Sequence, residues 1–135
     1  IHEWDYLTFL FGFPQSISSM QGKFSHLNIT SEDLAVYIAQ YKDKLIELHL
    51  DYFGREFQRS IELFTKNNTV FADFINSRIS FSDGQADIMF NENSNDKYLR
   101  EMEYFISLCK GNVDNINSIE NAISVLALSQ NKILK

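Results

Sequence analysis

The sequence predicts an α+β fold, a mainly antiparallel open-faced sheet of about six strands with helices packed on one face. Three observations lead to this prediction. Apolar residues recur at helical spacing near both ends of the chain, whereas apolar and polar residues alternate through its middle. Short polar turns separate the alternating segments, as in β-hairpins. Strands joined by hairpins and followed by helices favour an antiparallel sheet with its helices on one side.

Length and composition limit the class of protein. A chain of 135 residues predicts a single domain spanning 1–135. The net charge is −6 and the basic residues are scattered, so we expect no nucleic-acid partner. No apolar run approaches the roughly 18 residues of a membrane span, so we expect no membrane partner. Cys109 is the single cysteine, which excludes an internal disulfide and fits a cytoplasmic protein.

The first helix is predicted to run from the start of the chain to Gly12. Trp4, Leu7 and Phe11 form its apolar stripe, and Pro14 follows the glycine that ends it. No capping residue precedes this helix. We therefore expect the chain to be part of a longer protein, without the segment that would come before it.

Seven segments have the composition of strands. Residues 32–41 are apolar on both faces, which predicts a central strand, whereas 45–53 alternate sharply, which predicts a half-buried strand. Asn67-Asn68 and Asp83-Gly84 predict tight hairpin turns. The other expected strands are 15–24, 58–65, 69–75, 78–82 and 85–90.

Two helices are expected to close the chain. Residues 98–109 place their apolar side chains on one helical face, with Cys109 expected as a small buried residue, and Gly111 ends the helix. Ser118 can cap a last helix whose buried side begins with Ile119 and Ala122.

Several of these segments carry a resemblance to a known family. They are Ile1–Gly12 with its H-x-x-D pair, Glu32–Val36, Leu48–Arg55, Ile61–Phe64, Tyr98–Gly111 and Asn117–Ala122. In this order and spacing they resemble the C-terminal domain of the glucose–fructose oxidoreductase / inositol dehydrogenase / MocA (Gfo/Idh/MocA) family. The resemblance covers nearly the whole chain.

The resemblance implies the substrate-binding and oligomerisation domain of an NAD(P)-dependent oxidoreductase that acts on a sugar, sugar alcohol or nucleotide sugar. The cofactor of the full-length protein would be NAD or NADP. The family's N-terminal Rossmann domain is absent, so we expect this chain to bind no dinucleotide and to be inactive alone. Thr65 and Asn68 stand in a hairpin where the family usually has glycines, and an aspartate that usually precedes the histidine is missing.

The resemblance also implies roles for individual residues. His2 matches the catalytic histidine, and an imidazole suits proton removal from a hydroxyl because histidine changes its charge near neutral pH. Asp5, Tyr52 and Arg55 are the expected substrate-binding residues. The alternatives are a histidine without a role at a frayed terminus, a solvated carboxylate at Asp5, and an ion pair of Arg55 with a neighbouring glutamate.

Two further expectations concern ligands. Arg55 and Arg59 are predicted to share one strand face and form an anion site, which would favour an anionic nucleotide sugar over a neutral polyol. His2, His26 and His49 lack the spacing of metal ligands, so we expect no metal site and an exposed or satisfied sheet histidine at His49.

The whole chain is expected to form a homodimer or homotetramer through the open face of its sheet. The alternative function is a non-catalytic sheet-based binding or dimerisation module. A cystatin-like or ketosteroid-isomerase-like ligand domain fits the sheet but not the order of the helices. A glycine-rich loop upstream of the chain would favour the oxidoreductase over the module.

Overall fold

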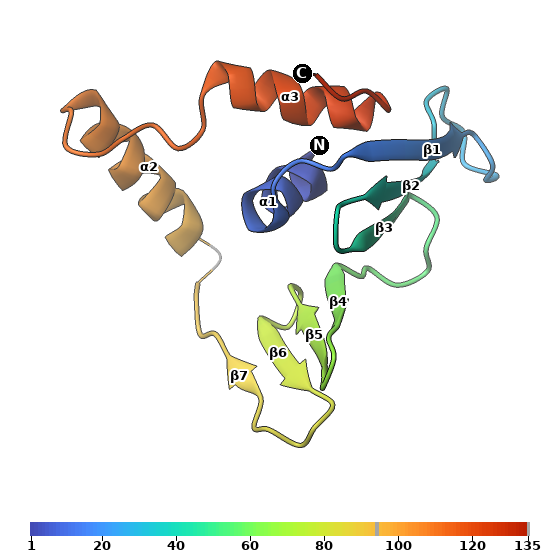
Figure 1. The fold of residues 1–135 in the computed structure, drawn as a ribbon, viewed down its shortest axis with the longest axis horizontal. Helices are drawn as coiled ribbons and strands as arrows, with labels where there is room; N and C mark the ends of the chain where they lie inside the picture. The colour runs from blue at the N-terminus through green and yellow to red at the C-terminus, as the bar shows by residue number, and fades with distance from the viewer. Residues whose placement is uncertain (94, 135) are drawn as a thin grey trace. The chain divides into compact units, whose positions relative to one another are not determined.

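The structure is a computed structural model that describes residues 1–93 and 95–134 (Figure 1). Its elements are α1 (His2–Phe11), β1 (Ser16–Gly22), β2 (Leu34–Gln40), β3 (Leu45–Asp51), β4 (Ser60–Phe64), β5 (Thr69–Asp73), β6 (Arg78–Phe81), β7 (Ile88–Met89), α2 (Asp96–Cys109) and α3 (Ile119–Ser129). The predicted α+β class, with open antiparallel sheets, is confirmed.

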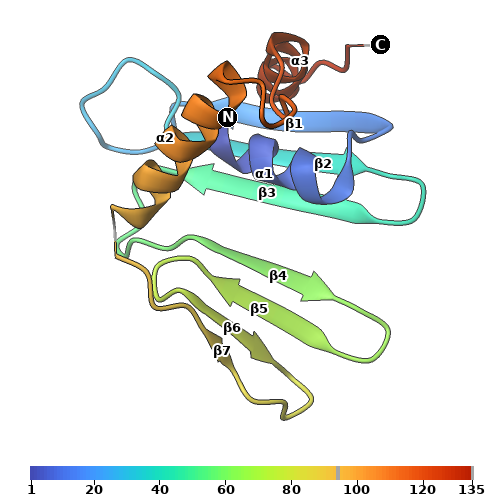
Figure 2. The same cartoon turned by 90° about the vertical axis from the view of Figure 1, so that its left-hand side faces the viewer.

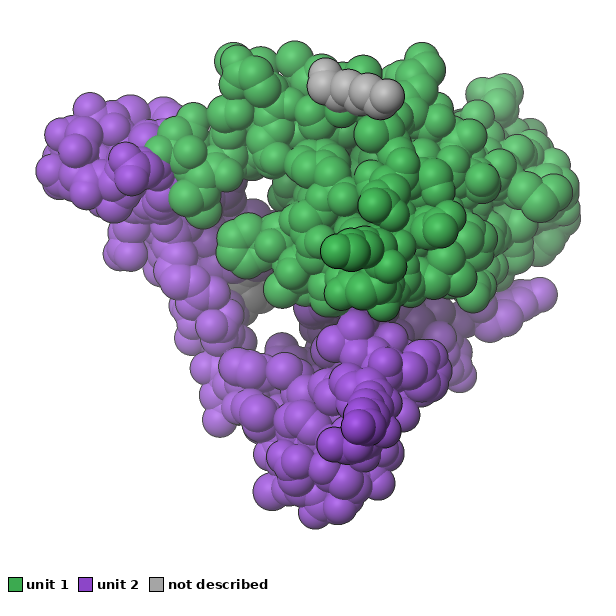
Figure 3. Space-filling view, viewed as in Figure 1, with its two compact units in different colours: residues 1–54, 115–135 green, residues 55–114 purple. Residues whose placement is uncertain are grey.

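The chain divides into two compact units, coloured separately in Figure 3. Unit 1 consists of Ile1–Gly54 and Asn115–Lys135, and unit 2 of Arg55–Asp114. Each unit contains its own antiparallel sheet, in the order β1-β2-β3 in unit 1 and β4-β5-β6-β7 in unit 2. The strands therefore pair as two sheets, where a single sheet was expected.

Unit 1 has a packed core between its sheet and two helices. Tyr37 and Ala39 on the central strand β2 are buried, as is Leu48 on β3, and Trp4 of α1 lies edge-on to the Tyr37 ring with centroids 5.4 Å apart. Figure 2 shows α1 and α3 beside this sheet. The Tyr37 hydroxyl donates to the Ser129 carbonyl at the end of α3, over 2.9 Å. Alternation on β2 and β3 thus supplies the apolar face that both helices cover.

The helix α1 ends at Phe11 because a glycine, Gly12, follows it. Gly12 has φ 75°, a conformation that glycine adopts without steric cost, and its N–H donates to the Thr8 carbonyl over 2.8 Å. The Tyr41 hydroxyl then donates to the Gly12 carbonyl over 3.1 Å. The helix therefore ends where the sequence predicts, and its end is hydrogen-bonded to the residue that follows β2.

The hairpin turn between β4 and β5 forms without the glycines that the resemblance led us to expect. The Thr65 hydroxyl donates to the Asn68 carbonyl over 2.7 Å and accepts from the Asn68 N–H over 3.0 Å. The side-chain carbonyl of Asn68 accepts from the N–H and hydroxyl of Ser82. Side-chain hydrogen bonds thus fix this turn between β4 and β5.

The strand expected at 85–90 is shorter in the structure. The Asp83 carboxylate accepts hydrogen bonds from both the backbone and the side-chain amide of Gln85, which extends the turn around Gly84. Pairing with β6 therefore begins only at Ile88, and β7 is limited to Ile88–Met89.

The helix α2 is amphipathic as predicted, but none of its residues is buried. The expectation that Cys109 is buried is wrong, because Cys109 is exposed. The physical reason is that unit 2 has no buried core among its described residues, 55–93 and 95–114, against which the apolar stripe of this helix could pack. In the last helix, by contrast, the Ser118 hydroxyl accepts from the Asn121 N–H over 3.2 Å, which confirms the predicted cap of α3.

Candidate functional site

The exposed side of α1 carries the first two predicted site residues. Trp4 and Leu7 are buried on the inner side of this helix, whereas His2 and Asp5 are exposed, three residues apart. Phe9 is 78% exposed and lies on the same outward stripe, because positions i, i+3 and i+7 coincide on a helix. The core contact of Trp4 therefore fixes which way the His2–Asp5 pair points.

The polar atoms of this pair are available to a ligand. Among residues 1–93 and 95–134, no side chain or backbone group hydrogen-bonds the His2 imidazole or the Asp5 carboxylate. The backbone of Asp5 is engaged, since its N–H donates to the Ile1 carbonyl and its carbonyl accepts from the Thr8 hydroxyl. A helical backbone thus presents an imidazole and a carboxylate whose polar atoms can still form hydrogen bonds, a combination that can accept a proton and bind hydroxyl groups.

Tyr52 lies immediately after β3 in unit 1. Its side chain is 73% exposed, while its N–H donates to the Asp33 carbonyl over 3.0 Å. The Asp51 carboxylate accepts from the N–H groups of Phe53 and Gly54 and lies 3.1 Å from the His49 imidazole. The backbone on both sides of Tyr52 is therefore fixed, although its ring is not packed.

Arg55 is the first residue of unit 2, and the expectation for its neighbourhood needs correction. The predicted pairing of Arg55 with Arg59 on one strand face is wrong, because β4 begins only at Ser60 and Arg55 lies in a bend. The Arg59 guanidinium instead lies over the Phe74 ring, 5.7 Å from its centroid. The alternation argument for an anion site therefore fails.

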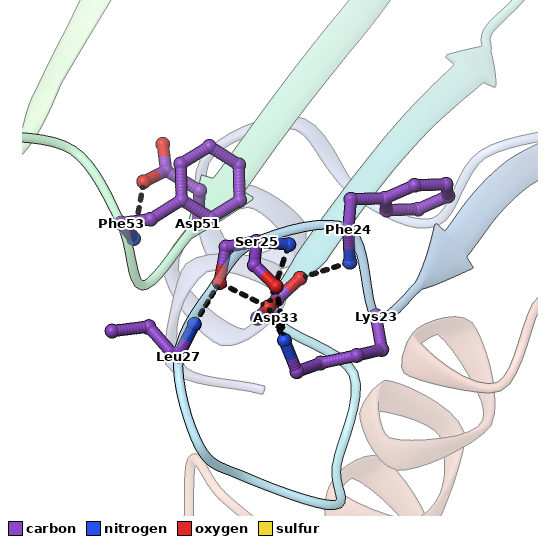
Figure 4. A network of polar contacts seen from close by, with 7 residues as sticks. All are labelled: Lys23, Phe24, Ser25, Leu27, Asp33, Asp51 and Phe53. Atoms are coloured by element: carbon purple, nitrogen blue, oxygen red, sulfur yellow. Dashed lines mark hydrogen bonds and ion pairs between the residues drawn. The ribbon is translucent and has the colours of Figure 1, made fainter.

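Sequence reasoning missed a buried polar cluster that is centred on Asp33 (Figure 4). Asp33 precedes β2 and is 2% exposed. Its carboxylate accepts from the Phe24 N–H over 2.7 Å and from the N–H and hydroxyl of Ser25 over 3.1 and 2.5 Å. Lys23 adds an ion pair at 3.1 Å. The Asp33 carboxylate thus binds the first three residues of the loop between β1 and β2.

The electrostatics of Asp33 reflect two opposing effects. Burial favours the neutral acid and raises the pKa of Asp33, but the hydrogen bonds from Phe24, Ser25 and Lys23 favour the carboxylate more strongly. The net result is a pKa well below the ordinary aspartate value. In sequence, the only signal was an aspartate at the start of a strand after a polar loop, which does not identify its partners.

The pKa of Asp51 is also lowered, chiefly by the Gly54 N–H, and further by the neighbouring His49 and the Phe53 N–H. His49 is exposed on the sheet, as expected. In the described part of the chain, no group of three or more histidine, cysteine or acidic side chains could hold a metal ion. Within the same part, no helix has the length and apolar character needed to cross a membrane.

The glycines do not fit a dinucleotide. Binding of a pyrophosphate requires a glycine-rich turn at a helix N-terminus. Gly12 and Gly111 instead follow helices with positive φ, and Gly84 lies in the β6–β7 turn. These three glycines therefore end helices or form a hairpin turn, and none of them precedes the first turn of a helix.

No family model and no curated protein matches this sequence, whereas several solved structures do. A presumed oxidoreductase from Klebsiella pneumoniae matches with a TM-score of 0.76 and 14% identity, over 96% of this chain and 43% of its own. UDP-N-acetylglucosamine 3-dehydrogenase GnnA from Acidithiobacillus ferrooxidans matches with a TM-score of 0.75 and 18% identity, over 96% and 42%.

A third match is YPO2259, a presumed oxidoreductase from Yersinia pestis, with a TM-score of 0.69 and 14% identity over 98% of this chain and 47% of its own. The chain therefore spans less than half the length of each of these proteins. At these identities the likeness shows a shared fold. This chain has the fold of one part of larger oxidoreductases.

Proposed function

We propose that this chain is the substrate-binding domain of an NAD(P)-dependent oxidoreductase of the Gfo/Idh/MocA type, acting on a sugar, a sugar alcohol or a nucleotide sugar. The observation that supports it best is the exposed His2–Asp5 pair, whose side chains have no hydrogen-bond partner among the described residues, on a helix anchored by Trp4. It occurs in a fold shared with part of a UDP-N-acetylglucosamine 3-dehydrogenase. A carbohydrate alcohol is the substrate class that such a pair suits.

In this proposal the residues of the chain bind the substrate and move one proton. The His2 imidazole accepts the proton of the hydroxyl that is oxidised, and the Asp5 carboxylate accepts a hydrogen bond from a neighbouring hydroxyl. Tyr52 offers a phenol and an aromatic surface at the end of β3. Because the glycines of this chain do not form a dinucleotide site, the cofactor would be held by another part of the full-length protein.

A titration of the chain with candidate substrates tests the binding half of this proposal. We expect UDP-N-acetylglucosamine or a sugar alcohol to shift the NMR signals of the His2 ring and the Asp5 backbone, saturating in the millimolar range or tighter. His26 is an exposed histidine in the same unit and provides the internal control. Equal shifts at both histidines, or none at any ligand concentration, would contradict substrate binding at α1.

A further inference from the structure

The turn between β6 and β7 contains the only aspartate of the sequence that is followed by a glycine, Asp83-Gly84. Both residues are exposed. Gly84 has φ 85°, and a Cβ atom placed on it would have no neighbouring atom within 4 Å. Among residues 1–93 and 95–134, no group accepts a hydrogen bond from the Gly84 N–H. The nitrogen of Gly84 is therefore accessible, because neither a side chain nor a hydrogen bond shields it.

The carboxyl group of Asp83 is folded back over the peptide bond that joins it to Gly84. Its Oδ1 atom accepts the Gln85 N–H over 3.1 Å, and its Oδ2 atom accepts the Gln85 side-chain amide over 2.7 Å. A hydrogen bond from an aspartate side chain to the main chain two residues further on closes a ring, the Asx turn. The Asp83 carboxyl carbon and the Gly84 nitrogen are thus held together in one small ring.

A second aspartate, Asp51, has a carboxylate turned in the same way, but the nitrogen next to it is not available. The carboxylate accepts the Phe53 N–H over 3.0 Å. Tyr52 follows Asp51 with a bulky side chain, and its N–H donates to the Asp33 carbonyl over 3.0 Å. Hydrogen bonding, chiefly from the Gly54 N–H, also lowers the pKa of Asp51, which reduces the amount of neutral acid.

A third aspartate, Asp73, shows the same restriction. Its carboxylate accepts the N–H two residues further along over 2.9 Å. Phe74 follows it, and the Phe74 N–H donates to the Arg59 carbonyl over 3.0 Å. The Asn76 side chain is the main cause of the lowered pKa of Asp73. The turn between β6 and β7 therefore differs from both of these turns, because its aspartate lies beside a nitrogen that is free to react.

We propose that Asp83 is a site of spontaneous backbone modification, at which aspartate converts to isoaspartate. The Gly84 nitrogen attacks the carboxyl carbon of the neutral Asp83 side chain. An N–C bond forms, and the Gly84 proton leaves with the hydroxyl group of the acid as water, which gives a cyclic succinimide. Water then adds to the main-chain carbonyl carbon of Asp83 and breaks its bond to the Gly84 nitrogen. The chain now continues through the former side chain, with no net change in mass or oxidation state.

The conversion changes the connection between β6 and β7. Isoaspartate adds a methylene group to the main chain, and the former main-chain carbonyl becomes a free carboxylate. The strand β7 consists of Ile88–Met89 alone, so its pairing with Ile79 and Arg78 depends on few hydrogen bonds. A strand of this length has little stability of its own. We therefore expect the conversion to weaken the pairing of β7 with β6.

Peptide mapping of the complete folded chain, after several weeks at 37 °C, detects the product. One tryptic peptide, 79–97, contains both Asp83 and Asp87. Fragmentation by electron transfer distinguishes isoaspartate from aspartate of equal mass. We expect isoaspartate at Asp83, on the order of 10-fold more than at Asp51 or Asp73, because each of those sites must first break a main-chain hydrogen bond.

The pH dependence identifies the reacting form. The neutral acid loses its hydroxyl group, and an ordinary aspartate titrates near 4. Conversion at Asp83 should therefore be faster at pH 5 than at pH 8. Hydrolysis of an asparagine side chain accelerates as the pH rises and increases the mass of the peptide, so it is distinguished from this reaction in the same experiment.

Two variants and one neighbouring residue provide controls. Gly84→Ala places a methyl group beside the nitrogen and should slow the conversion. Asp83→Glu keeps the charge but would require a larger ring, so no isomerised residue should form at position 83. Asp87 is followed by the β-branched Ile88 and should remain aspartate in the same peptide. Circular dichroism checks that both variants keep the wild-type content of helix and strand.

Any of four results would overturn this assignment. They are the absence of isoaspartate at Asp83 after the incubation, equal amounts at Asp83 and Asp87, a rate that is higher at pH 8 than at pH 5, and an unchanged rate in Gly84→Ala. Each measurement follows the main chain of the protein without a ligand, so the outcome is independent of the substrate proposed for His2 and Asp5.

Discussion

The environment of Asp33 changes the chemistry of its carboxyl group. Its carboxylate is buried and still ionised, because backbone N–H groups, the Ser25 hydroxyl and Lys23 stabilise the charge. The Asp33 main chain also joins the ends of two strands, since its N–H donates to the Gly22 carbonyl and its carbonyl accepts from the Tyr52 N–H. Loop 23–33 and the position of Tyr52 thus depend on one residue.

The pH dependence of stability follows from this arrangement. The pKa of Asp33 is lower in the folded state than in the unfolded chain, where an aspartate titrates near 4. Its contribution is therefore complete above the unfolded value and is lost as the pH falls toward the folded value. We expect Asp33→Asn to lower the melting temperature more at pH 7 than at pH 3. Equal losses at both pH values in thermal unfolding would contradict this role.

Trp4 holds the helix that carries the candidate site. It is 1% exposed, and replacing a buried tryptophan with alanine typically costs about 3–5 kcal/mol. Its indole N–H has no hydrogen-bond partner among the described residues. We therefore expect Trp4→Phe, which removes that donor and keeps an aromatic ring, to cost clearly less than Trp4→Ala in chemical denaturation. Equal losses would show that ring packing contributes little.

The helices provide a test at the scale of an element. Removal of the Ser118 cap leaves the Asn121 N–H without its partner, so Ser118→Ala should cost about 1 kcal/mol of unfolding free energy. Ser124 lies within the same helix and its hydroxyl donates back to the Glu120 carbonyl. Because such bonds contribute little to helix stability, Ser124→Ala should be close to neutral. Comparable losses in urea titrations of both variants would exclude a specific capping role.

Local sequence patterns predicted most of the helices and strands, because these elements depend mainly on residues that are neighbours in the sequence. Alternation identified the strands, and Gly12 and Ser118 marked helix boundaries that the structure confirms. The failures concern contacts between distant segments. Cys109 lies on an apolar stripe, yet burial requires a packing partner that the pattern cannot supply. Asp33 has its partners 8–10 positions away, across a loop whose conformation no periodicity describes.

The candidate site was predicted in part. Helical spacing places His2 and Asp5 on one face of α1. Because Trp4 is buried on the other side of the helix, the face that carries His2 and Asp5 is exposed to solvent. The Arg55–Arg59 anion site depended on a strand that does not form there, because β4 begins at Ser60. Site residues on a regular element can thus be placed from sequence, whereas those in the segment between two strands cannot.

At the scale of the whole molecule, the two units should differ in stability. Unit 1 contains the buried core, while no described residue of unit 2 is buried. Segments with little buried apolar surface open at low free-energy cost. We expect amides of β5 and β6 to exchange faster than those of β2 in a dilute sample. Equal protection of all three strands would contradict this difference between the units.

The proposed function is tested most directly by turnover in the full-length oxidoreductase that the proposal requires. His2→Ala should lower kcat by roughly 10²–10⁴-fold, the usual contribution of a positioned acid–base group, and should leave cofactor affinity nearly unchanged. His26→Ala, the exposed histidine outside the site, should leave turnover at the wild-type level. Near-wild-type turnover for His2→Ala, or equal losses for both variants, would remove His2 from the chemistry and contradict the proposed function.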